Sequence, residues 1–279
     1  MPANGHTYAS SELCQTLLSC HTCVLNRQCL TSGLNAADMQ QLDSIVRRHR
    51  PLHKGEYLFR AGDVMHNLYA VRSGAVKTCF LDADGNEQIS GLHLPGELVG
   101  LEALGIGAYY GDAIALETTM VCSLPLQPLE ELAGRLPTLR KQLLRATSRE
   151  LHYEQQHFSH CREAAEQRLT SFLLNLSVRF SKRGLSATYF RLPMSRGDVA
   201  NYLGLTIETV SRLLSRYRQL GLIEFYGREI HLLDRPALCL LSGAQAFQRS
   251  NGNSGTSLAP LHLVPVALGP GAMDAKPSR

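Results

Sequence analysis

The sequence lacks any stretch of 18 or more uncharged apolar residues, so it contains no candidate for a membrane-spanning helix. Its first residues, MPANGHTYAS, lack the basic region and apolar run of a secretory signal peptide. A glycine-rich phosphate loop, a Ser-His-Asp order and a His-x-x-Glu-His set are also missing, so catalysis has no candidate residues. We therefore expect a cytoplasmic protein that makes no contact with a membrane and is not an enzyme.

The 279 residues conceal a strong charge asymmetry under a net charge of only +4. Residues 1–134 contain 8 basic and 14 acidic residues, whereas residues 135–230 contain 16 and 8. A basic second half indicates a polyanionic partner, because neutralised phosphates supply most non-specific affinity for nucleic acid. A solvated basic helix face is the alternative explanation.

The length and the 44% of hydrophobic residues suit two packed domains.

Short extended runs separated by glycines fill the region from about Leu42 to Leu126. The glycines stand mostly 11 or 12 residues apart, at Gly55, Gly62, Gly74, Gly85 and Gly96. The runs between them cover residues 57–59, 68–71, 76–81 and 88–94. Such spacing predicts a β-sandwich or barrel. The Asp-Gly pair at Asp84 and Gly85 predicts a hairpin turn, because it tolerates positive φ angles.

A long charged segment without glycine or proline runs from Thr138 to about Phe180, which is typical of helix. Apolar residues recur in it every seven positions, at Leu144, Leu151, Phe158 and Ala165. This stripe suits a partner helix, and we predict a dimer interface; packing against its own domain is the alternative. Residues 242–279 are rich in Ser, Gly, Asn, Pro and Ala, so we predict a disordered tail.

The segment from Pro193 to Leu214 is typical of two helices around a glycine turn. Ser195 and Asp198 fit an N-terminal cap, Gly204 fits the turn, and Thr206 fits the cap of a second helix that reaches about Leu220. The helical period assigns a buried face to Ile207, Val210, Leu214 and Tyr217. It leaves an exposed face with Glu208, Ser211, Arg212 and Ser215.

The exposed face has the chemistry that reads base edges in a major groove. Arginine donates two hydrogen bonds to guanine and glutamate accepts one from the cytosine amine, each good pair contributing roughly 1 to 3 kcal/mol of discrimination. Alternation around Tyr226-Gly227-Arg228 adds a β-hairpin wing, whereas a purely structural helix pair is the alternative. We predict DNA contacts from six residues: Ser195, Thr206, Glu208, Thr209, Ser211 and Arg212.

With these motifs, the span from about Cys20 to Asp234 resembles the CRP/FNR superfamily of bacterial regulators. The resemblance implies an α+β fold and a dimer, with a cysteine-rich segment (1–30), a β-roll sensor (31–136), a dimerisation helix (137–163), a winged helix-turn-helix (164–241) and a tail (242–279). The cyclic-AMP receptor branch has Arg and Gly where this chain has Ile207 and Ser211. The combination Glu208, Ser211, Arg212 matches the FNR branch, which reads TTGAT-type inverted repeats.

Eight cysteines are unusual in a cytosolic chain, where metal or redox roles are commoner than disulfides. Cys20, Cys23 and Cys29 form a C-x2-C-x5-C triplet, close enough to bind one metal centre. A fourth thiol would come from Cys14, Cys79, Cys122, Cys161 or Cys239. The spacing leaves a zinc site, an iron-sulfur cluster and unligated thiols open.

The resemblance narrows this choice. FNR-type oxygen sensors carry such a triplet and one distant cysteine of the β-roll, in a context like Glu117 to Cys122, and together these hold an oxygen-labile 4Fe-4S cluster. It therefore implies Cys20, Cys23, Cys29 and Cys122 as ligands, with Cys14 as a substitute if the register differs. It implies a dimer that forms with the intact cluster and regulates anaerobic-metabolism genes, with a zinc or thiol redox site as the alternative. We expect Cys79, Cys161 and Cys239 to act as small apolar residues.

The resemblance also leads to expectations about two further partners, cyclic AMP and RNA polymerase. A cyclic nucleotide would need Arg-Ser-Ala where this chain has Gly111-Asp112-Ala113, and an aspartate would repel its phosphate, so we do not expect cyclic AMP to bind. An acidic turn resembles the FNR-family surface that contacts RNA polymerase, and comprises Asp82, Asp84, Gly85 and Glu87. A solubilising loop is the alternative for this turn.

Overall fold

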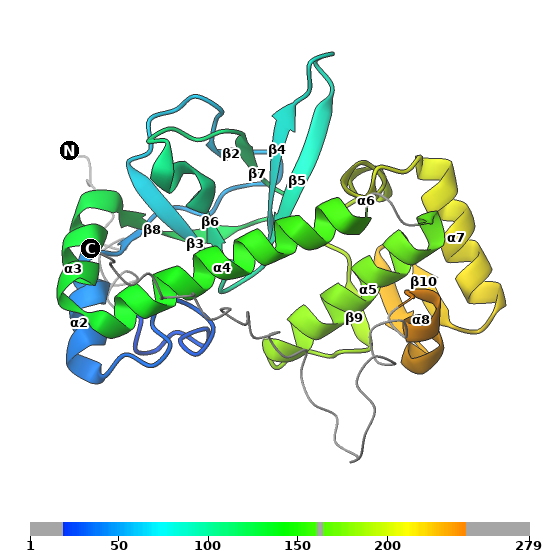
Figure 1. The fold of residues 1–279 in the computed structure, drawn as a ribbon. Coiled ribbons are helices and arrows are strands. Elements are labelled where there is room, and N and C mark those ends of the chain that lie inside the picture. The colour runs from blue at the N-terminus through cyan, green and yellow to red at the C-terminus, as the bar shows by residue number, and fades with distance from the viewer. Residues whose placement is uncertain (1–18, 161–163, 244–279) are drawn as a thin grey trace, which may run out of the picture. The chain divides into compact units, whose positions relative to one another are not determined.

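The structure is a computed structural model that describes residues 19–160 and 164–243, with side chains except those of residues 156–160 (Figure 1). Cys14, Cys161 and nearly all of the predicted tail lie outside these ranges. Two four-stranded sheets precede a group of helices and a three-stranded sheet, which confirms the predicted α+β fold. In the described ranges no helix combines the length and apolarity needed to cross a membrane.

The two sheets form a β-roll in which every strand pair is antiparallel. One sheet has the order β1 (Arg47–Arg48), β8 (Met120–Pro125), β3 (Asn67–Ser73) and β6 (Leu98–Val99). The other has the order β2 (Tyr57–Phe59), β7 (Asp112–Ala115), β4 (Val76–Leu81) and β5 (Glu87–His93). Gly85 adopts φ 80° in the turn between β4 and β5, which confirms the hairpin.

The roll also has helices that the glycine spacing did not predict. They are α2 (Ala36–Ile45), the 3-10 turn η1 (Leu101–Gly105) and α3 (Leu126–Arg135). Asn35 caps α2 by accepting a hydrogen bond from the Asp38 amide. Leu42 of α2 and Leu129 of α3 are almost fully buried in the same apolar core as Leu68 of β3.

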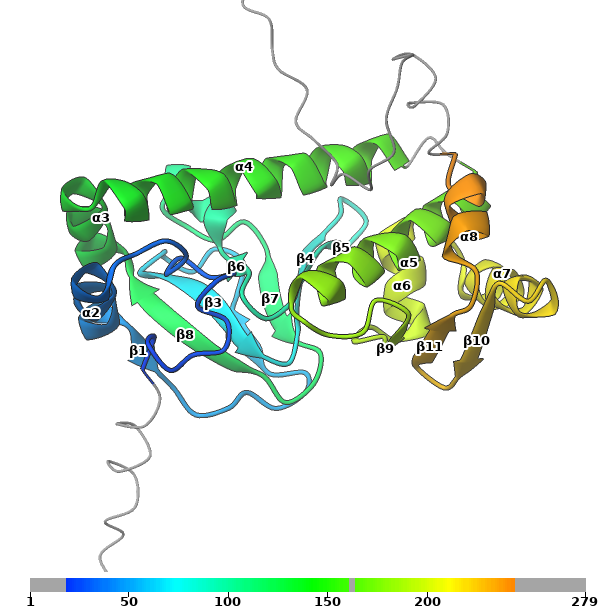
Figure 2. The same ribbon diagram turned by 90° about the horizontal axis from the view of Figure 1, so that it is seen from below.

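The long charged segment forms two helices rather than one: α4 (Pro137–His160) and α5 (Ala165–Lys182). Ala165, the last member of the seven-residue stripe, begins α5 and so does not belong to the face of α4 that carries Leu144 and Leu151. Figures 1 and 2 both show α4 running along the roll, with α2 and α3 beside its first turns.

The C-terminal group contains α5, α6 (Arg196–Leu203), α7 (Ile207–Gln219) and α8 (Arg235–Leu241), with the sheet β10 (Ile223–Tyr226), β11 (Glu229–Leu232) and β9 (Tyr189–Arg191). Tyr217 is fully buried at its centre. Its hydroxyl lies 2.7 Å from that of Thr170 and donates to the Glu166 carbonyl at 2.9 Å, so the only polar atom of this side chain is satisfied.

A buried carboxylate joins the roll to this group. Glu97 accepts hydrogen bonds from Arg179 in the last turn of α5 and from Arg183, which directly follows this helix, and its own side chain is 22% exposed. Burial alone would raise the pKa of Glu97, but the two guanidinium groups outweigh it and lower that pKa to about 2.

We predict that Glu97→Gln lowers the free energy of unfolding by about 3 kcal/mol at pH 7, because it leaves two buried arginines without their anion. Since the pKa of Glu97 is lower folded than unfolded, its contribution is complete above about pH 4.3 and is lost as the pH falls toward 2. Urea unfolding from pH 7 to pH 3 measures both effects. Glu56→Gln, which breaks an exposed pair with Arg50, is the control and should change little. Equal effects of the two variants would contradict the prediction.

Candidate nucleic-acid interface and thiol cavity

The first helix of the predicted pair begins and ends as its sequence indicates. The Ser195 hydroxyl accepts from the Asp198 amide at 3.1 Å, and the Asp198 carboxylate accepts from the Ser195 amide at 2.9 Å. Gly204 ends α6 in the left-handed region at φ 61° and ψ 42°, which only glycine adopts without strain. The predicted cap and turn are therefore confirmed.

The second helix, α7, is capped by Thr206, whose hydroxyl accepts from the Thr209 amide at 3.2 Å. Val210, Leu214 and Tyr217 are buried as predicted. Ile207 is 51% exposed, so its assignment to the buried face was wrong. It lies in the first turn of α7 beside Gly197, which has no side chain to cover it.

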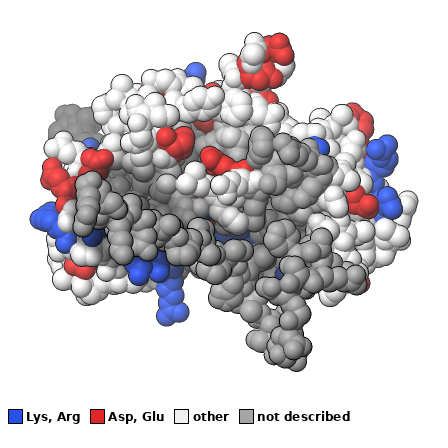
Figure 3. All heavy atoms as spheres, viewed as in Figure 1, with Lys and Arg blue, Asp and Glu red and all other residues white. Residues whose placement is uncertain are grey.

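The opposite face of α7 is open to solvent. Glu208 and Arg212 are exposed, and Ser211 and Ser215 are partly exposed. Lys and Arg side chains stand out on the surface over α7 in Figure 3. Ser195, Thr206 and Thr209 differ from this set, because their hydroxyl groups take part in the helix caps. They lie where amide groups at a helix start face outward, which suits phosphate rather than base contact.

A wing follows α7, as the alternation predicted. β10 and β11 pair from Ile223 opposite Leu232 to Tyr226 opposite Glu229, and Gly227 turns the chain at φ 59°. Tyr226 at the tip is 87% exposed. Pairing of β9 with β11 adds a third strand that the sequence pattern did not indicate.

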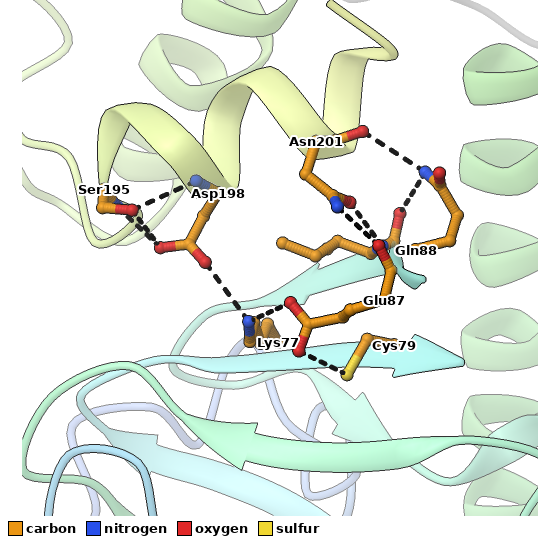
Figure 4. Close-up of polar contacts among 8 residues, drawn as sticks. Lys77, Cys79, Glu87, Gln88, Ser195, Asp198 and Asn201 are labelled. Atoms are coloured by element: carbon orange, nitrogen blue, oxygen red, sulfur yellow. Dashed lines mark hydrogen bonds and ion pairs between the residues drawn. The ribbon is translucent and has the colours of Figure 1, made fainter. Parts of the chain in front are cut away.

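The β4–β5 hairpin docks against α6 (Figure 4). The Asn201 side chain donates to the Glu87 carbonyl at 2.6 Å and accepts from the Ile89 amide at 2.7 Å. Lys77 Nζ lies 2.6 Å from the Glu87 carboxylate and 3.2 Å from that of Asp198. Lys77 and Asn201 thus bind the first helix of the pair to the roll, a role that no spacing in the sequence signalled.

The residues of the acidic turn that we assigned to RNA polymerase differ in their contacts, because only some of them take part in this docking. Glu87 is held by Lys77, whereas Asp84 and Gly85 are exposed at the tip of the hairpin. Asp82 Oδ1 accepts from the amides of Asp84 and Asn86 at 2.9 and 2.8 Å, so it shapes the turn. Figure 3 shows the acidic side chains at the tip of the hairpin, free of any covering element.

Cys20, Cys23, Cys29 and Cys122 line one cavity of about 460 Å³, part of which is open to solvent. Its remaining lining is mostly apolar, including Leu30, Leu42, Val46, Ala70 and Leu124, with the guanidinium side chains of Arg48 and Arg72. Cys79 is buried in β4 away from the cavity. Cys239 is exposed, so the expectation of a small interior residue is wrong there.

Burial raises the pKa of three of the thiols that line this cavity, those of Cys20, Cys29 and Cys122. Burial raises the pKa of Cys29 to about 11. Burial also raises the pKa of Cys20, with Asp43 adding to the rise and Arg48 opposing it. For Cys122 burial raises the pKa while Arg48 and Arg72 lower it. A metal centre would have to displace these protons, because only the thiolate is a ligand.

In residues 19–160 and 164–243, no three His, Cys, Asp or Glu side chains are placed to hold a single metal ion. The four thiols line one space. The donor set and the mostly apolar lining fit a larger centre that spreads its thiolates over several metal atoms.

Two further predicted features have clear positions. Leu144 and Leu151 on α4 are 66% and 55% exposed, whereas the side chain of Phe158 lies outside the described residues.

In the roll, Tyr109 stacks on Phe59 with ring centroids 3.7 Å apart, and Asp112 accepts a hydrogen bond from the Ala61 amide at 2.8 Å. Asp112 thus has a structural role in the roll.

Comparison with known proteins places these parts among relatives. Residues 49–135 match the cyclic nucleotide-binding domain family and residues 167–241 the Crp-like helix-turn-helix domain family. The transcriptional activator protein FnrA of Stutzerimonas stutzeri is 51% identical over 225 residues, covering 80% of this chain and 92% of that protein. The fumarate and nitrate reduction regulatory protein of Escherichia coli is 44% identical, over 81% and 91%.

A solved structure shares the arrangement. FixK2 from Bradyrhizobium japonicum aligns with a TM-score of 0.64 and 32% sequence identity, covering 71% of this chain and 97% of that one. The order of roll, long helix and helix-turn-helix is therefore common to this chain and its relatives.

Proposed function

The chain belongs to the CRP/FNR family of transcription regulators, and on that premise we propose that it senses oxygen through a 4Fe-4S cluster. Cys20, Cys23, Cys29 and Cys122 would hold this cluster. The observation that carries the proposal is the meeting of four thiols, three from one loop segment and one from β8, around a single cavity. When bound, such a cluster supplies the oxygen-labile chemistry, and the protein supplies the ligands and the response.

The resemblance to the FNR branch favours a cluster over zinc. A structural zinc ion needs its four ligands at about 2.0 to 2.3 Å from one point. A cubane cluster takes one cysteine at each of four iron atoms, so its thiols stand farther apart around a larger space.

The cysteine segment contacts the helices that would carry the response. Gln142 of α4 donates to the Ser32 carbonyl at 2.6 Å, and Gln28 donates to the Lys182 carbonyl at the end of α5. Leu30 belongs to the same buried apolar cluster as Leu139 of α4. A rearrangement of the residues around Cys29 would therefore change the packing of α4.

The output of this arrangement is a DNA-bound dimer. The exposed leucines of α4 would pair with a second copy and place two α7 helices about 34 Å apart, one turn of DNA. Glu208, Ser211 and Arg212 would then read each half of a TTGAT-type inverted repeat, while Ser195, Thr206 and Thr209 contact phosphates. Such a regulator works in the cytoplasm, where the chromosome lies.

The hairpin tip around Asp84 and Gly85 would contact RNA polymerase, with Asp82 shaping the turn and Glu87 securing its base. The relatives are a transcriptional activator and a regulator of fumarate and nitrate reduction by name, so we assign control of anaerobic-metabolism genes, by activation or repression. Cyclic AMP is not part of the proposal, because Asp112 stands where its phosphate would need a cation.

We predict about four iron atoms and four sulfides per monomer in anaerobically isolated protein, and their loss on exposure to air. Cys122→Ser should remove most of both, because the roll supplies only this thiol to the cavity. Cys239→Ser is the matched control, since Cys239 is exposed and remote from the cavity lining. Iron and acid-labile sulfide analysis with visible absorption checks this. One zinc per monomer, or no metal, would refute the cluster and leave a zinc or thiol redox site.

We predict that Arg212→Ala lowers affinity for a TTGAT inverted repeat by about 10-fold or more, because one bidentate pair to guanine contributes roughly 1 to 3 kcal/mol. It should also reduce discrimination against a repeat with that base pair changed. Arg216→Ala is the control, because Arg216 lies toward the end of α7 beside Glu166. Gel-shift titration of both repeats should show no loss of discrimination in the control. Retained discrimination in Arg212→Ala would contradict this assignment.

We predict that Leu151→Asp makes the anaerobic protein monomeric, because it places a charge in the middle of the dimer stripe. Leu185→Asp changes an equally exposed leucine outside α4 and should leave the dimer intact. Analytical ultracentrifugation of both variants without oxygen distinguishes these outcomes. A dimer in both would show that α4 packs within its own chain.

A further inference from the structure

An ion pair at the edge of the thiol cavity connects two of the four cysteines. Arg48 of β1 lies directly opposite Cys122 of β8 in the sheet register. Its guanidinium group reaches across to Cys20, with Nη2 3.9 Å from Sγ, and also donates to the Asp43 carboxylate. Arg48 therefore faces Cys122 of the roll in the sheet and also contacts a thiol of the loop segment.

Asp43 completes the connection from the end of α2. Its Oδ1 accepts a hydrogen bond from the Cys20 amide at 2.9 Å, besides its bond to Arg48. The two side chains are only 19% and 24% exposed, so solvent screens this pair less than a surface pair. Cys20 belongs to neither a helix nor a strand, which makes these contacts its tie to the rest of the fold.

The chemistry of the proposed centre gives the arginine a second role. Four thiolates around an iron-sulfur core leave a net negative charge, and the cavity is otherwise mostly apolar. A negative centre in such surroundings is costly unless cations or hydrogen-bond donors offset it. Hydrogen bonds to the sulfur atoms and nearby charge are also what set the reduction potential of these clusters.

We propose that Arg48, held in place by Asp43, is a positioning residue that fixes Cys20 opposite Cys122 and offsets the negative charge of the cluster. The pair thereby sets the stability of the bound cluster and its reduction potential. This inference rests on the proposed function, because it concerns the same four thiols.

The test uses the full chain, reconstituted with iron and sulfide without oxygen, as wild type, Arg48→Met, Arg48→Lys and Arg50→Met. Arg50 is the matched control, because it forms the same kind of pair, with Glu56 at 2.9 Å, on the exposed surface outside the cavity. The measurements are iron and sulfide content, the reduction potential, and the rate at which visible absorption is lost in air.

We expect Arg48→Met to lose its absorption about 10-fold faster than wild type and to show a more negative reduction potential. Arg48→Lys should recover part of the potential, since it keeps the charge, but little of the lifetime, since it loses the forked geometry that spans Asp43 and Cys20. Arg50→Met should match wild type in both measurements.

An Arg48→Met protein with the potential and lifetime of wild type would overturn the proposal. If Arg48→Met does not fold, as judged by circular dichroism, Asp43→Asn decides the question, because it keeps the shape of Asp43 and removes its charge. Unchanged lifetime and potential in Asp43→Asn would then refute the pair. A wild-type protein that takes up no iron would refute the proposed function itself, an outcome distinct from a loaded wild type with unaffected variants.

Discussion

Burial of the Glu97 carboxylate is the constraint on which the placement of the DNA-binding helices depends. A carboxylate removed from water must be paired, and Arg179 and Arg183 meet this demand from the C-terminal end of α5. With α5 held there, α6 lies against the β4–β5 hairpin. Strand β5 is at the edge of its sheet, and the Asn201 side chain supplies hydrogen bonds to its Ile89 amide and Glu87 carbonyl. The buried side of α7 then packs on this group and its charged side remains outward.

The thiol cavity follows the same rule on a smaller scale. A loop segment has no ladder of backbone bonds to hold it, so polar side chains must do so, and Asp43 takes the Cys20 amide while Arg48 takes Asp43. Both partners come from regular elements, the end of α2 and the strand opposite Cys122. The segment that carries Cys20 is thereby fixed to a strand of the sheet, which a site needs if its side chains are to meet.

Much of this arrangement could be predicted from local sequence signals. Some features depend only on a few adjacent residues, so the local sequence predicts them. These are the caps at Ser195 and Thr206, the turn at Gly204 and the hairpin at Gly85. Contacts over 100 residues or more, such as Lys77 with Asp198, left no such signal. The prediction that Ile207 is buried was wrong for a related reason. The helical period assigns a side chain to one face of a helix, but it does not show whether a neighbouring residue covers that side chain. The proposal of Cys122 as the fourth ligand needed a family resemblance, since spacing alone left the fourth thiol open.

In the proposed function, helix α4 would combine the signal and the response in one element. Its first turns receive the cysteine segment through Gln142 and Ser32, and its exposed side carries Leu144 and Leu151. Burying one leucine contributes roughly 1.5 to 3 kcal/mol, so a stripe with few leucines yields a dimer near the balance point with its monomers. A few kcal/mol from the contact with the cysteine segment would then be enough to shift that balance. A longer apolar stripe would bind more tightly and respond less, because the same signal could no longer separate the subunits.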